Sequence, residues 1–279
     1  MMEASLIDDR DRLLRFAEQR FASDVDVEGV FLGGSLPAGT ADVYSDIDLR
    51  VVVKPEKHRW FVEHRREIPT NWPDFLFNEW RPGTVHCVSH FRFFVKIDIF
   101  YLSEADLEPS PWYTLPIRIL FDPRGVVERL LTRSVGLRFE VEEDDLDYSI
   151  SKGIAAAHEA FRRMQRDELI FAETLLDELR FHIIQADDWL FDRTPRTQLF
   201  SKYDQRGSGE VVAVLRQSFC VCDRPAVLVS LRTLSQLYRR QVIQLHDRFR
   251  LSRRLDSDVT ALDMLLLSRL PQALEELGE

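Results

Sequence analysis

Two aspartates in the first fifty residues have a spacing that suits metal binding. Asp46 and Asp48 stand one residue apart at the start of an apolar segment, residues 47–53. Alternate side chains of a strand point to the same face, so the two carboxylates would lie side by side. Like charges this close are unfavourable unless a cation lies between them. Because Mg²⁺ is commonly held by carboxylates together with substrate phosphates, the pair predicts a magnesium site.

A turn of small residues precedes this pair by about a dozen positions. Gly33, Gly34 and Ser35 end a second apolar segment, residues 27–32. Because the turn lacks bulky side chains, its backbone N–H groups and the Ser35 hydroxyl can approach a phosphate closely. The alternative is a simple strand-ending turn followed by solvated aspartates. Against it, the aspartates interrupt what would otherwise be an apolar strand, which favours a phosphate cradle next to a metal site.

A third carboxylate, Asp98, lies inside a long apolar run, residues 91–102, which predicts one buried strand. Lys96 would share its face, and a charge within an apolar run needs a partner. One interpretation pairs Lys96 with Asp98. The other places Asp98 beside the first two aspartates and closes a site of three carboxylates, which is favoured because functional sites gather perturbed carboxylates. The role of Lys96 stays open.

The composition is that of a soluble globular protein, with 279 residues, 45% of them hydrophobic and 30% charged. This length suffices for two domains. No apolar run approaches the roughly 20 residues that span a bilayer, and the acidic start of the chain is unlike a secretory signal, so we expect a cytoplasmic protein without membrane contact. The net charge of −10 disfavours nucleic acid as a partner and weakly favours a cationic one.

The second half of the sequence changes from strand-like to helical patterns. An acidic run at residues 140–147 marks a boundary, and we predict domains at residues 1–138 and 139–279. Apolar stripes with a period of three to four residues then predict five helices in an antiparallel bundle. Asp223 and Asp258 are expected to cap two of these helices, and Pro271 is expected to kink or end the last one.

The order of these motifs resembles the signature of the nucleotidyltransferase superfamily, which includes DNA polymerase beta and the antibiotic nucleotidyltransferases. The signature is an apolar residue, Gly, then Gly or Ser, followed some ten residues later by Asp-x-Asp and then by a third carboxylate on a later strand. The resemblance covers roughly the first 130 residues, and it is specific because separated elements agree in order. The matching positions are Leu32, Gly34, Ser35, Asp46, Asp48 and Asp98.

The resemblance implies an α+β fold, with an N-terminal mixed sheet flanked by helices and a C-terminal all-α bundle that recognises the acceptor. It implies transfer of a nucleoside monophosphate, AMP from ATP or another NTP, to a hydroxyl of a small molecule such as an aminoglycoside-type antibiotic. The Gly34–Ser35 turn would hold the triphosphate, and Asp46 and Asp48 would hold two Mg²⁺ ions. Asp98 would be a metal ligand, a general base, or both.

The resemblance says less about the helical half. Lys152 is similar in position and type to a lysine that meets the triphosphate in some of these enzymes, although a solvated surface lysine explains it equally well. Asp187, Asp188 and Trp189 combine acid and aromatic surface suited to an amino sugar, although a helix end with a core Trp is an equal alternative.

Two other functions remain open. One is nucleotidylation of a protein, as in minimal nucleotidyltransferases paired with helical partners; against it, this chain has its own helical half and Leu36, Pro37 and Ala38 where those proteins usually have an Arg. The other is a non-catalytic nucleotide sensor, which the intact set of three aspartates disfavours.

Overall fold

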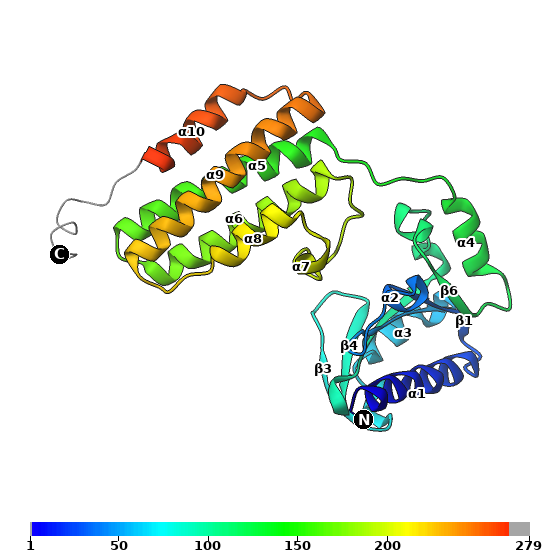
Figure 1. Cartoon of the computed structure of the whole chain (residues 1–279). Helices are drawn as coiled ribbons and strands as arrows, with labels where there is room; N and C mark the ends of the chain where they lie inside the picture. The colour runs from blue at the N-terminus through cyan, green and yellow to red at the C-terminus, as the bar shows by residue number, and fades with distance from the viewer. Residues whose placement is uncertain (1, 268–279) are drawn as a thin grey trace. The chain divides into compact units, whose positions relative to one another are not determined.

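The computed structural model describes residues 2–267, and the chain divides into two compact units, Met1–Arg138 and Phe139–Glu279 (Figure 1). The first unit contains a six-stranded sheet with helices, and the second is helical. The α+β fold predicted from the sequence is therefore confirmed. The roles assigned to the two parts, catalysis and acceptor recognition, stay predictions.

The N-terminal unit alternates strands with helices of very different lengths. Its α-helices and strands are α1 (Met2–Ala22), β1 (Val27–Gly33), α2 (Ser35–Ala38), β2 (Ile47–Val53), α3 (Pro55–His64), β3 (Phe75–Glu79), β4 (His86–Phe91), β5 (Lys96–Ser103), β6 (Arg118–Phe121) and α4 (Val126–Ser134). Short 3-10 turns lie at Ile68–Asn71, Arg92–Phe94, Glu104–Asp106 and Pro111–Thr114.

The sheet has the strand order β3-β4-β5-β2-β1-β6 and is mixed. Strands β2 and β5 run parallel at its centre, and the other neighbouring strands run antiparallel. Parallel strands need a crossover connection, and the chain between β2 and β5 supplies it with α3 and the β3–β4 hairpin. The two strands that carry the predicted carboxylates are thus adjacent.

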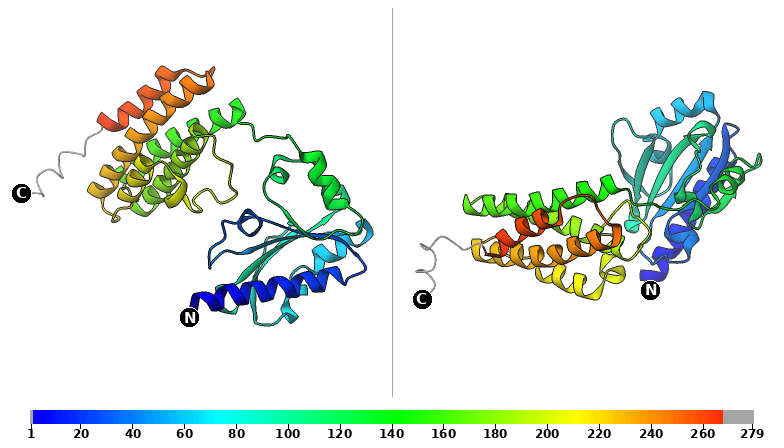
Figure 2. Two further views of the ribbon diagram at one scale, coloured as in Figure 1. Left: turned by 45° about the vertical axis from the view of Figure 1, so that its right-hand side comes forward. Right: turned by 90° about the horizontal axis from the view of Figure 1, so that it is seen from above.

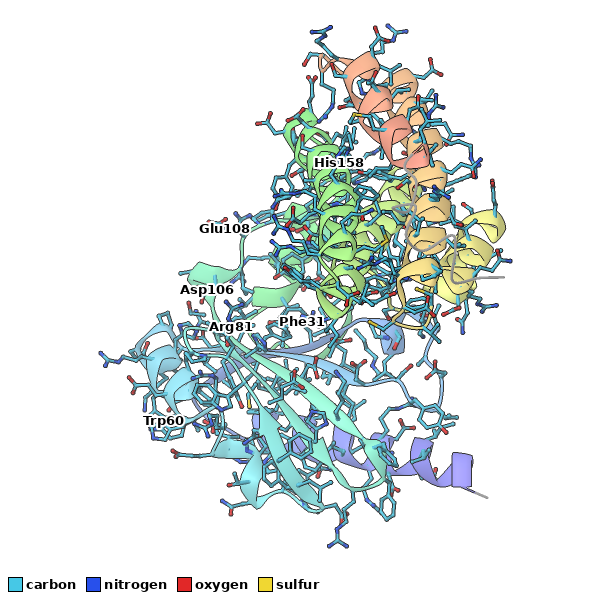
Figure 3. All side chains as sticks on the ribbon, turned by 90° about the vertical axis from the view of Figure 1, so that its left-hand side faces the viewer. Phe31, Trp60, Arg81, Asp106, Glu108 and His158 are labelled. Carbon is cyan, nitrogen blue, oxygen red and sulfur yellow. The ribbon has the colours of Figure 1, made fainter. Side chains whose placement is uncertain are left out.

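The two faces of the sheet differ in how they are covered. On one face, side chains of α1 and α3 such as Phe21 and Phe61 pack on Val51 and Ile99 in a single apolar cluster, and α1 runs along the sheet in Figure 1. On the other face, α4 covers only the region of β1 and its neighbours, where the fully buried Phe31 lies (Figure 3). Side chains alternate between these faces along each strand.

One strand prediction was wrong. The apolar run 91–102 is not a single strand, because β4 ends at Phe91, a tight turn follows at Arg92–Phe94, and β5 begins at Lys96. Phe93 and Phe94 both have φ near +63° in this turn. Left-handed conformations are rare for aromatic residues, so apolar patterning alone gave no signal of the chain reversal.

The C-terminal unit consists of helices, and both views of Figure 2 show its long helices lying lengthwise beside one another. Its helices are α5 (Glu143–Gln165), α6 (Leu169–Leu190), α7 (Tyr203–Arg206), α8 (Gly209–Gln217), α9 (Arg224–Phe249) and α10 (Leu255–Leu267). Buried residues such as Ile150, Leu179 and Leu234 form one apolar cluster across α5, α6 and α9. His158 joins α5 to α10, with its Nε2 atom 2.8 Å from the Ala261 carbonyl oxygen (Figure 3).

The two predicted helix caps of this unit had different outcomes. Asp223 is the N-cap of α9, and its side chain accepts a hydrogen bond from the backbone N–H of Ala226. Asp258 is not a cap, because α10 begins at Leu255 and places Asp258 inside the helix. There it is buried and accepts hydrogen bonds from Arg253, with His246 also in contact. The predicted kink at Pro271 lies outside the described residues.

The buried His182 of α6 makes the stability of the bundle depend on pH. Burial lowers the pKa of His182 from 6.5 to about 4, and its Nδ1 atom lies 2.8 Å from the Ser149 hydroxyl. Between these two pKa values the unfolded chain binds more protons than the folded one, so stability falls as the pH falls through this window. When the pH is lowered from 7.5 to 5, we expect protonation of His182 in the unfolded chain to lower the free energy of unfolding by about 2 kcal/mol. Urea unfolding of the full chain at both pH values should show that the free energy of unfolding falls less for His182→Gln than for the wild type. Equal decreases in the two proteins would contradict the assignment.

Candidate active site

The three predicted carboxylates lie at one end of the central strand pair. Asp48 of β2 and Asp98 of β5 are register partners in the parallel ladder, and Asp46 comes just before β2 begins at Ile47. Residues in register point to the same face. Ile47 and Leu49, which alternate with Asp48, are fully buried in the cluster under α1 and α3, so the carboxylates belong to the opposite face.

Lys96 holds two of these carboxylates together. Its Nζ atom lies 2.8 Å from Asp46 Oδ2 and 3.2 Å from Asp98 Oδ1. All three side chains are partly shielded, with exposed fractions of 36% for Lys96, 31% for Asp46 and 19% for Asp98. The sequence left the role of Lys96 open between pairing with Asp98 and balancing the site. The structure combines both, since one ammonium group contacts both carboxylates.

Burial and mutual repulsion disfavour the ionised forms of two of these acids. Burial raises the pKa of Asp48, and the charges of Asp46 and Asp98 add to this effect, while the charge of Arg50 opposes it. Burial likewise raises the pKa of Asp98, although the Lys96 ammonium opposes the shift. The pKa of Lys96 is also raised, because its contacts with Asp46 and Asp98 outweigh the opposing effect of burial. The cluster thus retains more negative charge than Lys96 alone compensates.

The glycine turn makes room for side chains of β2. Gly34 has φ 74° and ψ −150°, a combination open essentially only to glycine. A Cβ atom at this position would overlap the carboxylate of Asp48. At Gly33 a Cβ atom would come within 2.7 Å of Nη1 of Arg50. The two glycines therefore let Asp48 and Arg50 lie directly against the end of β1, and the short helix α2 starts at Ser35.

Two functional assignments in the helical unit had different outcomes. Lys152 lies on α5 with its ammonium group 6.0 Å from the ring centre of Tyr148, and its proposed contact with a triphosphate stays a prediction. The acidic surface expected at Asp187 and Asp188 does not exist as a free surface, because both side chains are buried.

Ion pairs explain why these two acids are not available. Arg193 contacts both Asp187 and Asp188, and Arg206 contacts Asp188. The hydroxyl group of Tyr203 donates a further hydrogen bond to Asp187 at 2.5 Å. This network ties the end of α6 to the following loop, so it has a structural explanation without an acceptor.

The donors of the carboxylate cluster fit a hard divalent cation in type, because carboxylate oxygens are the ligands that Mg²⁺ prefers. Their arrangement is less favourable. Among the side chains of residues 6–267, no three or more His, Cys, Asp or Glu residues gather in a way that could hold a metal ion. Lys96 explains this, since its ammonium group takes the place between Asp46 and Asp98. A metal held by these acids would replace Lys96 there.

Sequence reasoning missed Arg50, although the alternation along residues 91–102 already placed Phe100 on the face of Asp98. Arg50 shares a face of β2 with Asp48, and Phe100 shares a face of β5 with Asp98. The guanidinium carbon of Arg50 lies 5.2 Å from the centre of the Phe100 ring. The alternation that placed Asp46 and Asp48 on one face would also have found Arg50, had it been continued two positions along that strand.

The described part of the chain has no helix long and apolar enough to cross a membrane.

No protein of curated function matches the sequence. An aminoglycoside 6-adenyltransferase from Bacillus subtilis resembles the structure at 11% identity and TM-score 0.45, covering 91% of this chain and 96% of the other. A nucleotidyltransferase-like protein from Exiguobacterium sibiricum does so at 13% identity and TM-score 0.42, covering 90% and 87%. At these values neither likeness bears on function.

A family model described as a nucleotidyltransferase domain matches residues 10–114. This segment includes the glycine turn, the first aspartate pair and Asp98, in the order that the sequence signature requires. Residues 10–114 are thus similar to the nucleotidyltransferase domain family.

Proposed function

We propose that this protein is an enzyme that transfers a nucleoside monophosphate, AMP from ATP, to a hydroxyl group of a small molecule. The observation that carries the proposal is the register pairing of Asp48 with Asp98 beside the Gly34 turn, inside the segment that matches a nucleotidyltransferase domain model. Two acids and a glycine turn at one end of a rigid strand pair suit phosphate chemistry. Such chemistry depends chiefly on positioning and on charge neutralisation.

Asp46, Asp48 and Asp98 would hold Mg²⁺, which supplies charge neutralisation at the phosphates and polarises the bond to the leaving group. The raised pKa values of Asp48 and Asp98 support this role, since a bound cation would favour their ionised forms. Asp98 would also be placed to accept the proton of the attacking hydroxyl. The Gly34–Ser35 turn would orient the triphosphate.

The acceptor that we expect is a small cationic molecule such as an amino sugar. The net charge of −10 supports this expectation, because an acidic protein attracts cations. The direct test is pyrophosphate release by the purified protein with Mg²⁺, each of the four NTPs and a panel of aminoglycosides, lincosamides and uncharged alcohols. Release that requires one NTP together with one acceptor supports the proposal, whereas no release with any pair refutes it.

Replacing a site carboxylate should remove transfer without unfolding the chain. Asp48→Asn keeps the shape of the side chain but removes its charge, and we expect turnover to fall about 1000-fold, as for the loss of several kcal/mol of transition-state stabilisation. Asp98→Asn should lower turnover while ATP binding persists. Asp26→Asn is the matched control, because Asp26 is ion-paired with Lys54 and Lys57 in the same unit. Full activity of both site variants would refute the assignment.

Replacing Gly34 should lower stability and activity far more than replacing Gly39, the other positive-φ glycine next to α2. Both have positive φ, but only at Gly34 would a Cβ atom meet Asp48, while nothing lies within 4 Å at Gly39. Gly39→Ala should cost only the backbone strain, about 1 kcal/mol. Gly34→Ala should cost more and also displace Asp48, so pyrophosphate release should be lost. Denaturant unfolding and turnover of both variants provide the measurement, and similar results for the two would count against this arrangement.

Removing Lys96 should make metal binding easier. In Lys96→Met, Mg²⁺ would no longer compete with an ammonium group for Asp46 and Asp98, so we expect about 3- to 10-fold tighter binding, as for a partly shielded ion pair. Without metal the variant should melt at a lower temperature, and added Mg²⁺ should raise its melting temperature more than that of the wild type. Lys57→Met is the charge-matched control, since Lys57 pairs with Asp26. Weaker Mg²⁺ binding by Lys96→Met in calorimetry would contradict this role.

A further inference from the structure

Arg50 occupies a central place on the face of the sheet that carries the carboxylates. It follows Asp48 by two residues on β2, so both side chains leave the strand on the same side. Its Nη1 atom donates a hydrogen bond to the backbone carbonyl oxygen of Asp48 at 3.1 Å. The guanidinium group therefore lies beside the metal-binding candidate rather than at the distant end of the strand.

The guanidinium group is held from two sides. Gly33 has no side chain at the point where Nη1 of Arg50 lies, and a Cβ atom there would come within 2.7 Å. On the other side, the ring of Phe100, the register partner of Arg50 on β5, lies 5.2 Å from the guanidinium carbon. Phe100 is stacked in turn on His86 of β4, with ring centres 5.0 Å apart. Neighbouring strands on both sides of β2 thus hold this positive charge, with Gly33 of β1 on one side and Phe100 of β5, backed by His86 of β4, on the other.

In the described part of the chain this guanidinium group has no carboxylate in direct contact, although the charge of Asp48 lies near enough to interact with it. Arg50 is partly buried, yet among residues 6–267 no carboxylate oxygen lies within 4.0 Å of its nitrogen atoms. A guanidinium group carries five N–H donors, and the described contacts of Arg50 use one of them for a hydrogen bond. Arg193 and Arg253, which are also partly buried, are paired with aspartates, whereas the buried Arg65 donates to backbone carbonyl oxygens instead. Arg50 therefore has donors free for an anionic ligand.

We propose that Arg50 binds a phosphate group of the nucleotide. This inference rests on the proposed function and assigns it a residue outside the sequence signature. Gly33, on which the guanidinium lies, immediately precedes the Gly34–Ser35 turn that would orient the triphosphate. Arginine suits this role because its planar fork donates two parallel hydrogen bonds to phosphate oxygens.

The charge balance of the face gives a reason for such a residue. A triphosphate brought next to Asp46, Asp48 and Asp98 meets three negative charges, and Lys96 contacts two of these three acids. Repulsion between like charges at short range disfavours that encounter. A fixed guanidinium beside Asp48 attracts the phosphates and offsets part of the repulsion. An anionic group on the acceptor would share this chemistry, so the test must separate the two sources.

The experiment measures binding of ATP, and separately of adenosine, by equilibrium dialysis with Mg²⁺ and without any acceptor. Arg50→Met should weaken ATP binding about 10- to 100-fold, the loss expected for a charge-assisted hydrogen bond, and should leave adenosine binding unchanged. Arg50→Lys should be intermediate. Arg59→Met is the control for net charge, since Arg59 is exposed and paired with Glu63 on α3.

The outcomes separate this inference from the proposed function. If the wild type binds ATP and Arg50→Met binds it equally well, the inference is overturned and the function stands. Pyrophosphate release with an acceptor is measured in parallel, and an unchanged affinity for ATP with a raised KM for the acceptor overturns the inference in favour of an acceptor anion. Equal losses for ATP and adenosine overturn it in favour of a structural role. If the wild type binds no NTP, the proposed function itself fails.

A double-mutant cycle tests the mechanism more closely. Gly33→Ala should push the guanidinium from its place, because the obstructing atom is the end of a flexible side chain rather than backbone. It should therefore weaken ATP binding when Arg50 is present and have little effect in an Arg50→Ala background. Equal effects of Gly33→Ala in both backgrounds would show that Gly33 acts independently of Arg50 and would overturn the proposed arrangement.

Discussion

The parallel pairing of β2 with β5 is the constraint on which the candidate site depends. It places Asp48 opposite Asp98, and the apolar residues between them fix that register. Leu49 and Ile99 are fully buried on the other face. Shifting either strand by one residue would turn a carboxylate into the core and an apolar side chain into solvent. The packing of α1 and α3 on the sheet thus determines which charges meet on the opposite face.

That geometry is electrostatically unfavourable by itself, and the surrounding residues compensate for it only in part. Lys96 bridges Asp46 and Asp98, yet burial and repulsion still raise the pKa of Asp48 and of Asp98. The glycines at 33 and 34 contribute space rather than charge, because side chains from β2 fill the volume that their Cβ atoms would take. The glycine turn therefore makes room for side chains of β2, including the Asp48 carboxylate, in addition to any contact that it makes with phosphate.

The sequence predicted the parts of this arrangement that depend on local patterns. Alternation along the strands placed Asp46, Asp48 and Asp98 in one group, helical periodicity predicted the bundle, and Asp223 was recognised as a cap. Features that depend on tertiary contacts were missed. The turn at Arg92–Phe94 contains no glycine to mark it. The partners of Asp187 come from a loop up to 21 residues away, and a neighbouring acid such as Asp188 looks the same in sequence whether it is solvated or paired.

Under the proposed function, the charges on the face of the sheet that carries the carboxylates imply that metal binding and nucleotide binding depend on each other. Asp46, Asp48 and Asp98 contribute three negative charges, while Lys96 and Arg50 contribute two positive ones, which leaves one negative charge in excess. A bound triphosphate adds several more negative charges, and a divalent cation removes two. Each ligand therefore improves the electrostatic environment of the other, and thermodynamic linkage requires the effect to be equal in both directions. A nucleotide that binds together with its metal would also displace Lys96 from between the carboxylates. The ammonium group of Lys96 would then be able to turn toward the phosphates.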